Sequence, residues 1–219
     1  VHLHKPSDQE VAERRGEMDW VSEIRDAFEQ QRFYLLYQPI VSLAQKDLGY
    51  ASHYELLLRM RDPMGREILP MAFLPAAERY NLMVEIDNWV VREAMRYIAR
   101  SGTSHCDSVF LINVSGTSLA DVEFVDFLET KLQGGAVSGE RICFEVSEAS
   151  AISNLRVLGE SISRLRELGC RVSLDDFGSS LGSFGYLKNM QIDYIKIDGG
   201  LVRDMQLDSV DAAMVHAIN

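Results

Sequence analysis

The sequence predicts an α/β fold with a parallel sheet, of the (β/α)-barrel kind, on the basis of two observations. β-prone and helical stretches alternate along the chain from Asp47 onward, as they do in folds that join parallel strands through helices. Polar residues also recur at the ends of five successive β-prone stretches, and these residues are Glu55, Asn113, Glu145, Asp175 and Lys196. Because (β/α) barrels draw their site residues from the carboxyl ends of several strands, this recurrence predicts a functional site at one face of the barrel.

The composition is that of an ordinary globular protein and argues against several functions. The chain has 219 residues, of which 47% are apolar and 25% charged, and no apolar run is long enough for a transmembrane helix. The formal net charge of −11 argues against long nucleic acid as a partner, since polyphosphate binding needs a basic surface. A small phosphate ester could still bind where metal ions supply positive charge. Cys106, Cys143 and Cys170 show neither zinc-site nor disulfide spacing, which predicts a reducing, cytoplasmic location.

The first part of the chain predicts one helix followed by two strands. Apolar residues three to four apart over residues 8–30 predict a helix, which is either a linker from an upstream domain or the first helix of this one. Residues 33–43 are β-prone but contain Pro39, which suits a strand end or an edge strand. In residues 50–61, alternation places Glu55 and Arg59 on one face, as an acid and a base of a site or as an ion pair on a surface strand.

The middle of the chain predicts helices around one strand. Two helical stretches lie within residues 71–100, and the second carries an apolar core stripe of Ile86, Trp89, Val90, Ala94, Tyr97 and Ile98. Residues 109–115 predict a strand that places Asn113 among apolar neighbours. Because a buried asparagine must satisfy its amide, its carbonyl oxygen is a candidate ligand. Residues 119–132 predict a single helix.

The last part of the chain predicts three strands alternating with helices. Residues 141–148 predict a strand with Glu145 in its interior, and residues 154–168 predict an amphipathic helix that ends at Gly169. Residues 171–174 and 194–198 predict two further strands, joined by a loop with a short helical turn. Asp208 caps a last helix, whose apolar stripe is Val210, Ala213, Met214 and Ala217.

Two adjacent carboxylates, Asp175 and Asp176, follow the strand at 171–174. Carboxylates at the end of a buried strand are costly unless a cation meets them, and hard divalent cations select oxygen ligands. The pair therefore indicates one or two divalent metals, or else an Asx-turn with a helix cap. Together with the other strand-end residues it favours a metal-dependent hydrolase or lyase on a barrel.

Seven motifs follow one another along the chain: YQPIV at 37–41, ELLLR at 55–59, FLPAAE at 73–78, INVS at 112–115, FEVSE at 144–148, DDFG at 175–178 and YIKID at 194–198. In this combination they closely resemble the EAL domain family, the cyclic di-GMP phosphodiesterase module of bacterial signalling. The resemblance implies a TIM-type (β/α)8 barrel with an antiparallel first strand. It also implies that residues 28–219 form the domain and that residues 1–27 are a linker helix following an upstream GGDEF or sensor domain.

The resemblance implies a divalent metal, Mg²⁺ or Mn²⁺, as one or two ions. Glu55, Asn113, Glu145 and Asp175 would hold it, and Asp176 would hold or orient the second ion. The implied reaction opens cyclic di-GMP to linear pGpG with a metal-activated water, and paired metals stabilise both the attacking and the leaving oxygen.

Further residues receive roles from the same resemblance. Lys196 would fix water or a phosphate oxygen, and it joins Glu55 and Asp175 in the implied catalytic set. Substrate contacts would come from Gln38, Arg59 and Asp176. Glu148 would anchor the loop that follows Asp176 and so couple the site to a homodimer interface. We expect Glu148 not to bind metal, since it lies three residues past Glu145 and strand alternation turns it to the other face.

Three departures from the family pattern bear on function. The signature is ELL instead of EAL, and Leu56 lies on the strand face opposite Glu55. The loop at 179–185 lacks the usual aromatic residue and its glycine, which bears on loop ordering and dimer coupling. The family's general-base glutamate lies on the strand after 194–198, so we expect six of eight barrel strands in these residues, with the last two strands missing and hydrolysis absent without them.

Three functions remain open on the sequence. The full-length protein is an active phosphodiesterase, a receptor that holds cyclic di-GMP without cleaving it, or a dimerisation module beside a GGDEF domain. The intact candidate ligands favour the enzyme, because a receptor has little need of a metal site, whereas the altered loop favours the other two.

Overall fold

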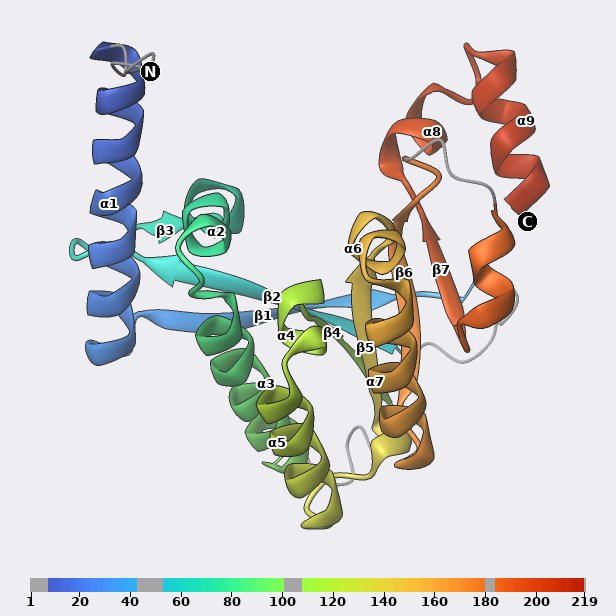
Figure 1. The fold of residues 1–219 in the computed structure, drawn as a ribbon, viewed down its shortest axis with the longest axis horizontal. Helices are drawn as coiled ribbons and strands as arrows, with labels where there is room; N and C mark the ends of the chain where they lie inside the picture. The colour runs from blue at the N-terminus through green and yellow to red at the C-terminus, as the bar shows by residue number, and fades with distance from the viewer. Residues whose placement is uncertain (1–7, 43–52, 101–107, 180–183, 219) are drawn as a thin grey trace, which may run out of the picture.

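The computed structural model describes residues 8–42, 53–100, 108–179 and 184–218, in which helices cover one face of a curved sheet (Figure 1). The strands are β1 (Phe33–Ile40), β2 (His53–Arg61), β3 (Glu67–Ile68), β4 (Val109–Asn113), β5 (Ile142–Ser147), β6 (Arg171–Phe177) and β7 (Tyr194–Ile197). The helices are α1 (Asp8–Glu29), α2 (Pro70–Arg79), α3 (Met83–Arg100), α4 (Gly116–Ala120), α5 (Val122–Gln133), α6 (Glu148–Ser153), α7 (Leu155–Glu167), α8 (Gly199–Asp204) and α9 (Ser209–Ile218).

The described strands form one open sheet that follows the strand order expected for a barrel of this kind. Its order is β1-β2-β4-β5-β6-β7, and the short β3 pairs with β2 off this path. β1 runs antiparallel to β2, and every later pair along the path is parallel. The predicted α/β fold of the TIM kind, with an antiparallel first strand, is therefore confirmed. Pro39 lies within β1, whose one partner among the described strands is β2, as the edge-strand prediction required.

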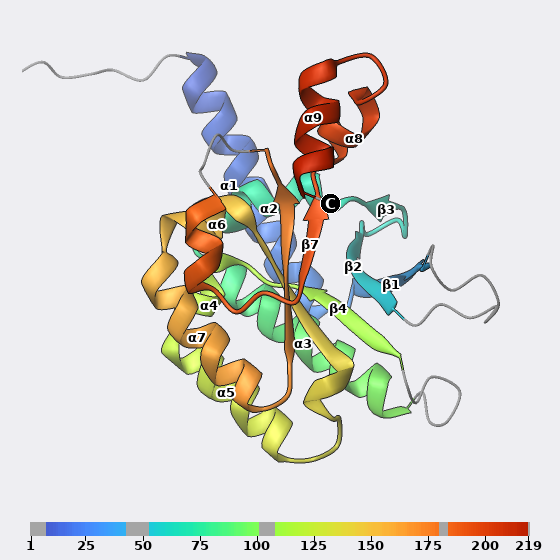
Figure 2. The same cartoon turned by 90° about the vertical axis from the view of Figure 1, so that its right-hand side faces the viewer.

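The two faces of the sheet differ in chemistry: the face under the helices is apolar, whereas the inner face carries polar side chains beside a small apolar cluster of Val109, Leu111 and Cys143. On the face covered by α3, α5 and α7 (Figure 2), the main core contains Leu56, Ile112, Phe144 and Leu174, each at most 3% exposed. Strand alternation turns the neighbours of these residues, among them Glu55, to the inner face of the curved sheet. Leu56 therefore lies opposite Glu55, as predicted from the ELL signature.

The predicted apolar stripe of α3 packs as core, whereas the stripe predicted for α9 was wrong. Ile86, Val90, Ala94 and Ile98 of α3 are buried, and Trp89 and Tyr97 pack partly buried beside them. In α9, Val210 is 63% exposed, Ala213 and Ala217 are also exposed, and the buried residue is Val215. α7 ends before Gly169, whose φ of +86° is the left-handed geometry expected after a helix. The Asp208 side chain accepts the backbone N–H of Val210 at 2.7 Å, so the predicted cap of α9 is confirmed.

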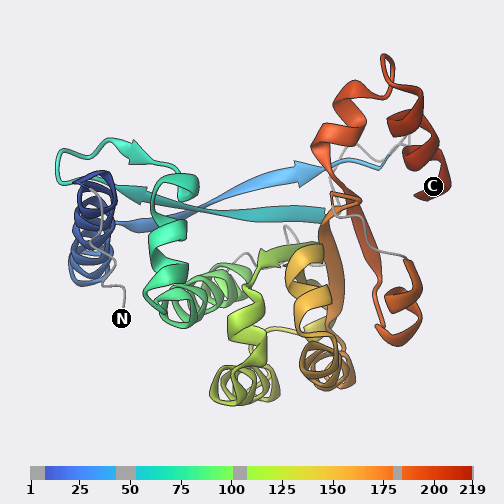
Figure 3. The same ribbon diagram turned by 45° about the horizontal axis from the view of Figure 1, so that its top comes forward.

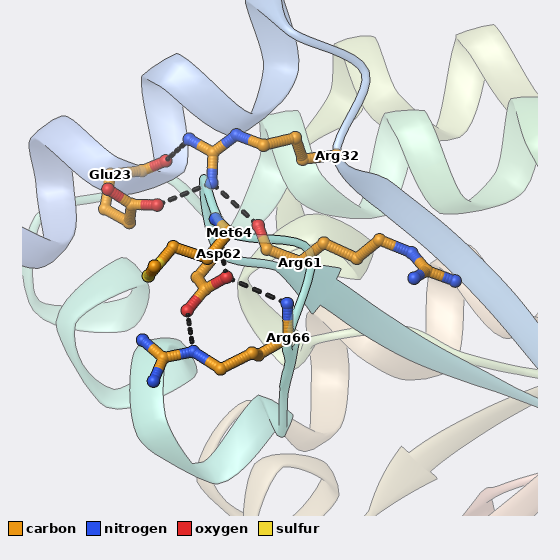
Figure 4. Close-up of polar contacts among 6 residues, drawn as sticks. All are labelled: Glu23, Arg32, Arg61, Asp62, Met64 and Arg66. Atoms are coloured by element: carbon orange, nitrogen blue, oxygen red, sulfur yellow. Dashed lines mark hydrogen bonds and ion pairs between the residues drawn. The ribbon is translucent and has the colours of Figure 1, made fainter.

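The end of α1 is part of the domain core. Ile24 and Ala27 are fully buried there. The guanidinium of Arg32 donates to Glu23 of α1 at 2.5 Å and to the Arg61 carbonyl at the end of β2 at 2.7 Å (Figure 4). These contacts fix the last turns of α1 against the sheet. The boundary at residues 27 and 28, and a linker role for the helix, stay predictions.

The β2–β3 turn is held by one carboxylate. Asp62 accepts the backbone N–H groups of Met64 and Arg66, each at 2.8 Å, and pairs with the Arg66 side chain (Figure 4). The resulting hairpin places β3 beside β2, and Figure 3 shows it at the α1 end of the sheet. Neither β3 nor α8 was predicted, because both are too short for a periodic pattern.

Three predicted boundaries were wrong for local reasons. The helix expected at 119–132 is two helices, because Asp121 leaves the helical region and caps α5 through the Phe124 N–H at 3.1 Å. The strand expected at 141–148 ends at Ser147, which caps α6, so that Glu148 begins a helix. The strand expected at 171–174 continues to Phe177 and contains both aspartates.

Candidate functional site

Five strands bring polar side chains to one point on the inner face of the sheet. The ammonium Nζ of Lys196 on β7 lies 3.0 Å from Glu55 Oε2, 3.2 Å from Glu145 Oε1 and 3.3 Å from Asp175 Oδ2. Asn113 Nδ2 donates to Glu55 Oε1 at 3.0 Å. The five residues predicted from strand ends therefore meet, although 141 positions separate Glu55 from Lys196 in the chain.

The strand register explains this meeting. Asn113 of β4 lies opposite Glu145 of β5, and Ser147 of β5 lies opposite Asp175 of β6. Because side chains alternate along each strand, two residues that are paired across neighbouring strands point to the same face of the sheet. A one-residue slip in any pair would send its site residue into the apolar core under the helices.

Asn113 differs from its prediction. The sequence predicts a buried asparagine, but Asn113 is exposed at the last position of β4. The apolar neighbours that suggested burial lie on the same strand and turn to both faces, whereas Asn113 itself stands where the strand ends. Its amide is satisfied by Glu55, and its carbonyl oxygen is the atom that could bind a cation.

Electrostatics at the cluster depend on burial and on the excess of carboxylates. Burial raises the pKa of Glu145 to about 7, opposed by Lys196 and reinforced by Glu55 and Asp175. Burial alone would lower the pKa of Lys196, but Glu145, Glu55 and Asp175 together hold it above its ordinary value. Lys196 is therefore a permanent cation shared by three carboxylates.

The two adjacent aspartates occupy different environments. Asp175 faces the cluster, while Asp176 is exposed, with a φ of +53° at an irregularity in the β6–β7 pairing. The Asp176 N–H donates to Asp175 Oδ1 at 3.0 Å. Burial raises the pKa of Asp176, and the Asp175 charge raises it further. The irregularity lets both carboxylates line one cleft, which strict alternation would forbid.

A cleft of about 380 Å³ opens at this end of the sheet. Its lining includes Arg59, Asn113, Glu145, Asp175 and Asp176, together with side chains of α2 and α3. A larger hollow of about 650 Å³ lies between α1, β1 and α3 and is lined mainly by aromatic and aliphatic side chains. The smaller cleft is the candidate site, because the convergent carboxylates lie in it.

Arg59 and Gln38 take different positions relative to this cleft. Arg59 lines it, donates to the Leu58 carbonyl at 2.7 Å and lies 3.9 Å from Glu67 Oε1 on β3. Gln38 is exposed on β1 opposite Glu55 and is not among the residues that line the cleft. Contacts of either residue with a substrate stay predictions.

Glu148 is buried beneath the loop that follows β6. Its Oε2 accepts the Gly178 N–H at 3.1 Å, and its Oε1 accepts the Tyr186 hydroxyl at 2.6 Å. The expected donors were residues 179–185, of which 180–183 lie outside the described residues. Glu148 begins α6, so the strand-alternation argument for its direction was wrong. Its role in coupling to a dimer stays a prediction.

The donor set fits a hard divalent cation. Both carboxylate oxygens of Glu145 are buried, and the group that the described residues bring to them is the Lys196 ammonium, 3.2 Å from Oε1. A buried carboxylate that lacks hydrogen bonds is costly unless a cation meets it. As the side chains stand in the described part of the chain, no three acidic, His or Cys residues form a closed metal cage. The Lys196 ammonium lies among the carboxylates instead.

Two residues around this site, Tyr186 and Asp87, carried little or no signal in the sequence. Tyr186, the partner of Glu148, follows a loop without periodicity and carried no signal. Asp87 on α3 is 4% exposed and accepts the Ser115 N–H at 2.9 Å and the Ser118 hydroxyl at 2.6 Å. An acid inside the apolar stripe of a helix was the available signal for Asp87.

The fold and site define a TIM-like (β/α) protein with a carboxylate-rich cleft at the strand ends, and comparison with known proteins identifies the family. The model of the EAL domain matches residues 21–219. The cyclic di-GMP phosphodiesterase PdeB of Shewanella oneidensis is 36% identical over 221 residues, which cover 100% of this chain and 25% of PdeB. The chain belongs to the EAL domain family, and it spans about a quarter of the length of this curated relative.

Solved structures agree with this family. The FimX EAL domain of Pseudomonas aeruginosa bound to c-di-GMP is 30% identical, with a TM-score of 0.81 over 91% of this chain and 79% of FimX. The PaMucR phosphodiesterase in complex with c-di-GMP is 32% identical, with a TM-score of 0.82 over 91% of this chain and 80% of that one.

Proposed function

We propose that the full-length protein hydrolyses cyclic di-GMP to linear pGpG through this domain, with Mg²⁺ or Mn²⁺ as its cofactor. The observation that carries the proposal is the convergence of Glu55, Glu145 and Asp175 on Lys196, with Asn113 hydrogen-bonded to Glu55, beside the cleft that Asn113, Glu145 and Asp175 line. The names of PdeB and of the PaMucR phosphodiesterase support the same reaction and substrate. A module that only held the nucleotide would have little need of three carboxylates against one ammonium.

The proposed roles follow from charge and position. Glu55, Asn113, Glu145 and Asp175 hold the cation, which supplies positive charge for the bridging phosphate and activates water when bound. Lys196 keeps the carboxylates together against their mutual repulsion and presents its ammonium to water or a phosphate oxygen. The net negative charge of the chain makes this local positive charge necessary for a dianionic substrate.

The remaining roles complete the proposal. Arg59 contacts a substrate phosphate from the wall of the cleft, while Gln38 and Asp176 reach the nucleotide from β1 and β6. Asp176 also holds or orients a second ion. Glu148 keeps the loop after β6 in place through Gly178 and Tyr186, and this loop couples the site to a homodimer.

The setting of the domain belongs to the same proposal. The protein acts in the cytoplasm with an upstream GGDEF or sensor domain in the same polypeptide. In the described residues, no helix has the length and apolar character needed to cross a membrane.

The test is hydrolysis by the full-length protein. Wild type, Glu55→Gln and Glu160→Gln are incubated with cyclic di-GMP and Mn²⁺, and pGpG is measured by chromatography. Glu160 is exposed on α7 and pairs with Arg156, so it provides the same substitution away from the cleft. We expect pGpG from wild type and from Glu160→Gln, and none from Glu55→Gln. Tight binding of cyclic di-GMP by wild type without any pGpG would favour the receptor function instead.

A further inference from the structure

Asp87 is a buried carboxylate whose contacts lead to the candidate site. It lies on α3 within an apolar stripe and is 4% exposed. Its Oδ2 accepts two hydrogen bonds, from the Ser115 N–H at 2.9 Å and from the Ser118 hydroxyl at 2.6 Å. Both partners are neutral, so the carboxylate is buried without a cation to offset its cost. A carboxylate kept at such a cost needs a reason beyond filling the core.

The two partners of Asp87 fix the turn that follows β4. Ser115 lies two residues after Asn113, and its side chain caps α4 by accepting the Ser118 N–H at 3.1 Å. The Ser115 hydroxyl in turn donates to the Ser118 hydroxyl at 2.9 Å. A single oxygen of Asp87 therefore accepts both the backbone N–H of Ser115 and the Ser118 hydroxyl, to which the Ser115 hydroxyl donates.

The turn connects directly to the carboxylate cluster. Between Asn113 and Ser115, the Val114 N–H donates to the Glu145 carbonyl at 2.9 Å. The Asn113 side chain then reaches Glu55 at 3.0 Å. Asp87 lines the same cleft as Asn113 and Glu145, so its carboxylate supports the site from the helix layer.

We propose that Asp87 is a positioning residue of the site: by holding the Ser115–Ser118 turn to α3, it sets where Asn113 stands relative to Glu55 and Glu145. The inference rests on the proposed function, since it assigns importance to the position of a candidate metal ligand. Hydrogen bonds behind a ligand commonly change metal affinity about 10–100-fold.

The geometry allows a sharp choice of variants. Because a single oxygen of Asp87 accepts both hydrogen bonds, the carbonyl oxygen of Asp87→Asn can accept them as well. Asp87→Leu keeps the approximate size but accepts neither, and Ser118→Ala removes one of the two donors. Ser161→Ala is the matched control, because its buried hydroxyl donates to the Leu119 carbonyl of α4 at 2.6 Å, away from Asn113.

The experiment measures Mn²⁺ affinity of the full-length protein without nucleotide, by the spectroscopic signal of free Mn²⁺, beside Tm in EDTA. We expect Asp87→Leu to weaken Mn²⁺ binding about 10–100-fold. Asp87→Asn and Ser161→Ala should stay within about threefold of wild type. Asp87→Leu should have no further effect in an Asn113→Ala background, because both changes act on the same ligand.

The outcomes separate the two proposals. If Asn113→Ala leaves Mn²⁺ affinity unchanged, Asn113 is no ligand and the proposed metal site is wrong at that position. If Asn113→Ala weakens binding but Asp87→Leu does not, or if the two effects add, the positioning role of Asp87 is overturned. Should Asp87→Leu fail to fold, Ser118→Ala decides: wild-type Mn²⁺ affinity in Ser118→Ala overturns the inference, and weakened affinity with an unchanged Asp87→Asn supports it.

Discussion

Gly116 packs closely against Ser150 where α4, which follows β4, meets α6, which follows β5. Gly116 begins α4, three residues after Asn113, and Ser150 lies on α6, five residues after Glu145. A Cβ at position 116 would lie 2.7 Å from the Ser150 Cβ. Because carbon atoms prefer about 3.5–4.0 Å, the helices would have to separate by about 1 Å. We therefore expect Gly116→Ala to destabilise the protein.

The magnitude follows from the cost of overpacking. Extra carbon atoms in a packed contact typically cost about 1–3 kcal/mol, and each kcal/mol lowers Tm by about 2–4 °C for a domain of this size. Gly159→Ala is the matched control, since a Cβ at that helical position meets nothing within 4 Å. It should raise stability by about 0.5–1 kcal/mol through helix propensity. Urea unfolding of both variants gives the comparison.

A second substitution tests the cause. In Gly116→Ala/Ser150→Gly the Ser150 side chain is gone, and the next atom, the Ser150 Cα, lies at an ordinary 3.6 Å. The double variant should recover about 1 kcal/mol or more relative to the sum of the two single changes. Wild-type stability of Gly116→Ala, or strict additivity of the pair, would refute the reasoning.

Three further predictions concern charged and hydrogen-bonded groups. Burial raises the pKa of Glu145 from 4.5 to about 7, so its stabilising contribution is present at low pH and is lost as the pH rises through 7. Urea unfolding in EDTA should therefore show that the unfolding free energy of Glu145→Gln, relative to that of wild type, rises by about 3 kcal/mol between pH 4.5 and pH 8. A free-energy difference that stays constant over this pH range would contradict the prediction. Arg59→Ala should weaken cyclic di-GMP binding at least about 10-fold in calorimetry, a loss of about 1.5 kcal/mol, and unchanged affinity would remove Arg59 from the site. Tyr186→Phe removes a 2.6 Å hydrogen bond to the buried Glu148 and should cost about 1–3 kcal/mol of unfolding free energy; a neutral result would mean that solvent replaces the hydroxyl.

The sequence predicted the elements whose patterns are long and local. The stripe of α3, the cap of α9 at Asp208 and the alternation of Glu55 with Leu56 all depend on neighbours a few positions away. Such patterns survive folding because they reflect the periods of the helix and the strand themselves. They also sufficed to name the five strand-end residues that meet at the candidate site.

The predictions from the sequence were wrong where a single side chain ended a helix or strand that the periodic pattern would have continued. Asp121 and Ser147 each cap a helix, so one predicted helix became two and Glu148 passed from a strand to a helix. Asn113 was expected to be buried because its neighbours are apolar, but burial depends on which strands and helices surround a position. The local sequence does not specify these tertiary neighbours, because they come together only when the chain folds.

The sequence by itself determined which residues are candidates for the chemistry and, for Glu55 and Leu56, on which face of the strand they stand, since alternation and motif order are properties of the chain. Only the tertiary structure decided that Asp87 supports the turn after Asn113, that Tyr186 reaches Glu148, and that both aspartates line one cleft. The two hydrogen bonds join residues 28 and 38 positions apart through the register of strands and the packing of helices. No local pattern specifies them, because the free energy that selects them arises only when the elements come together.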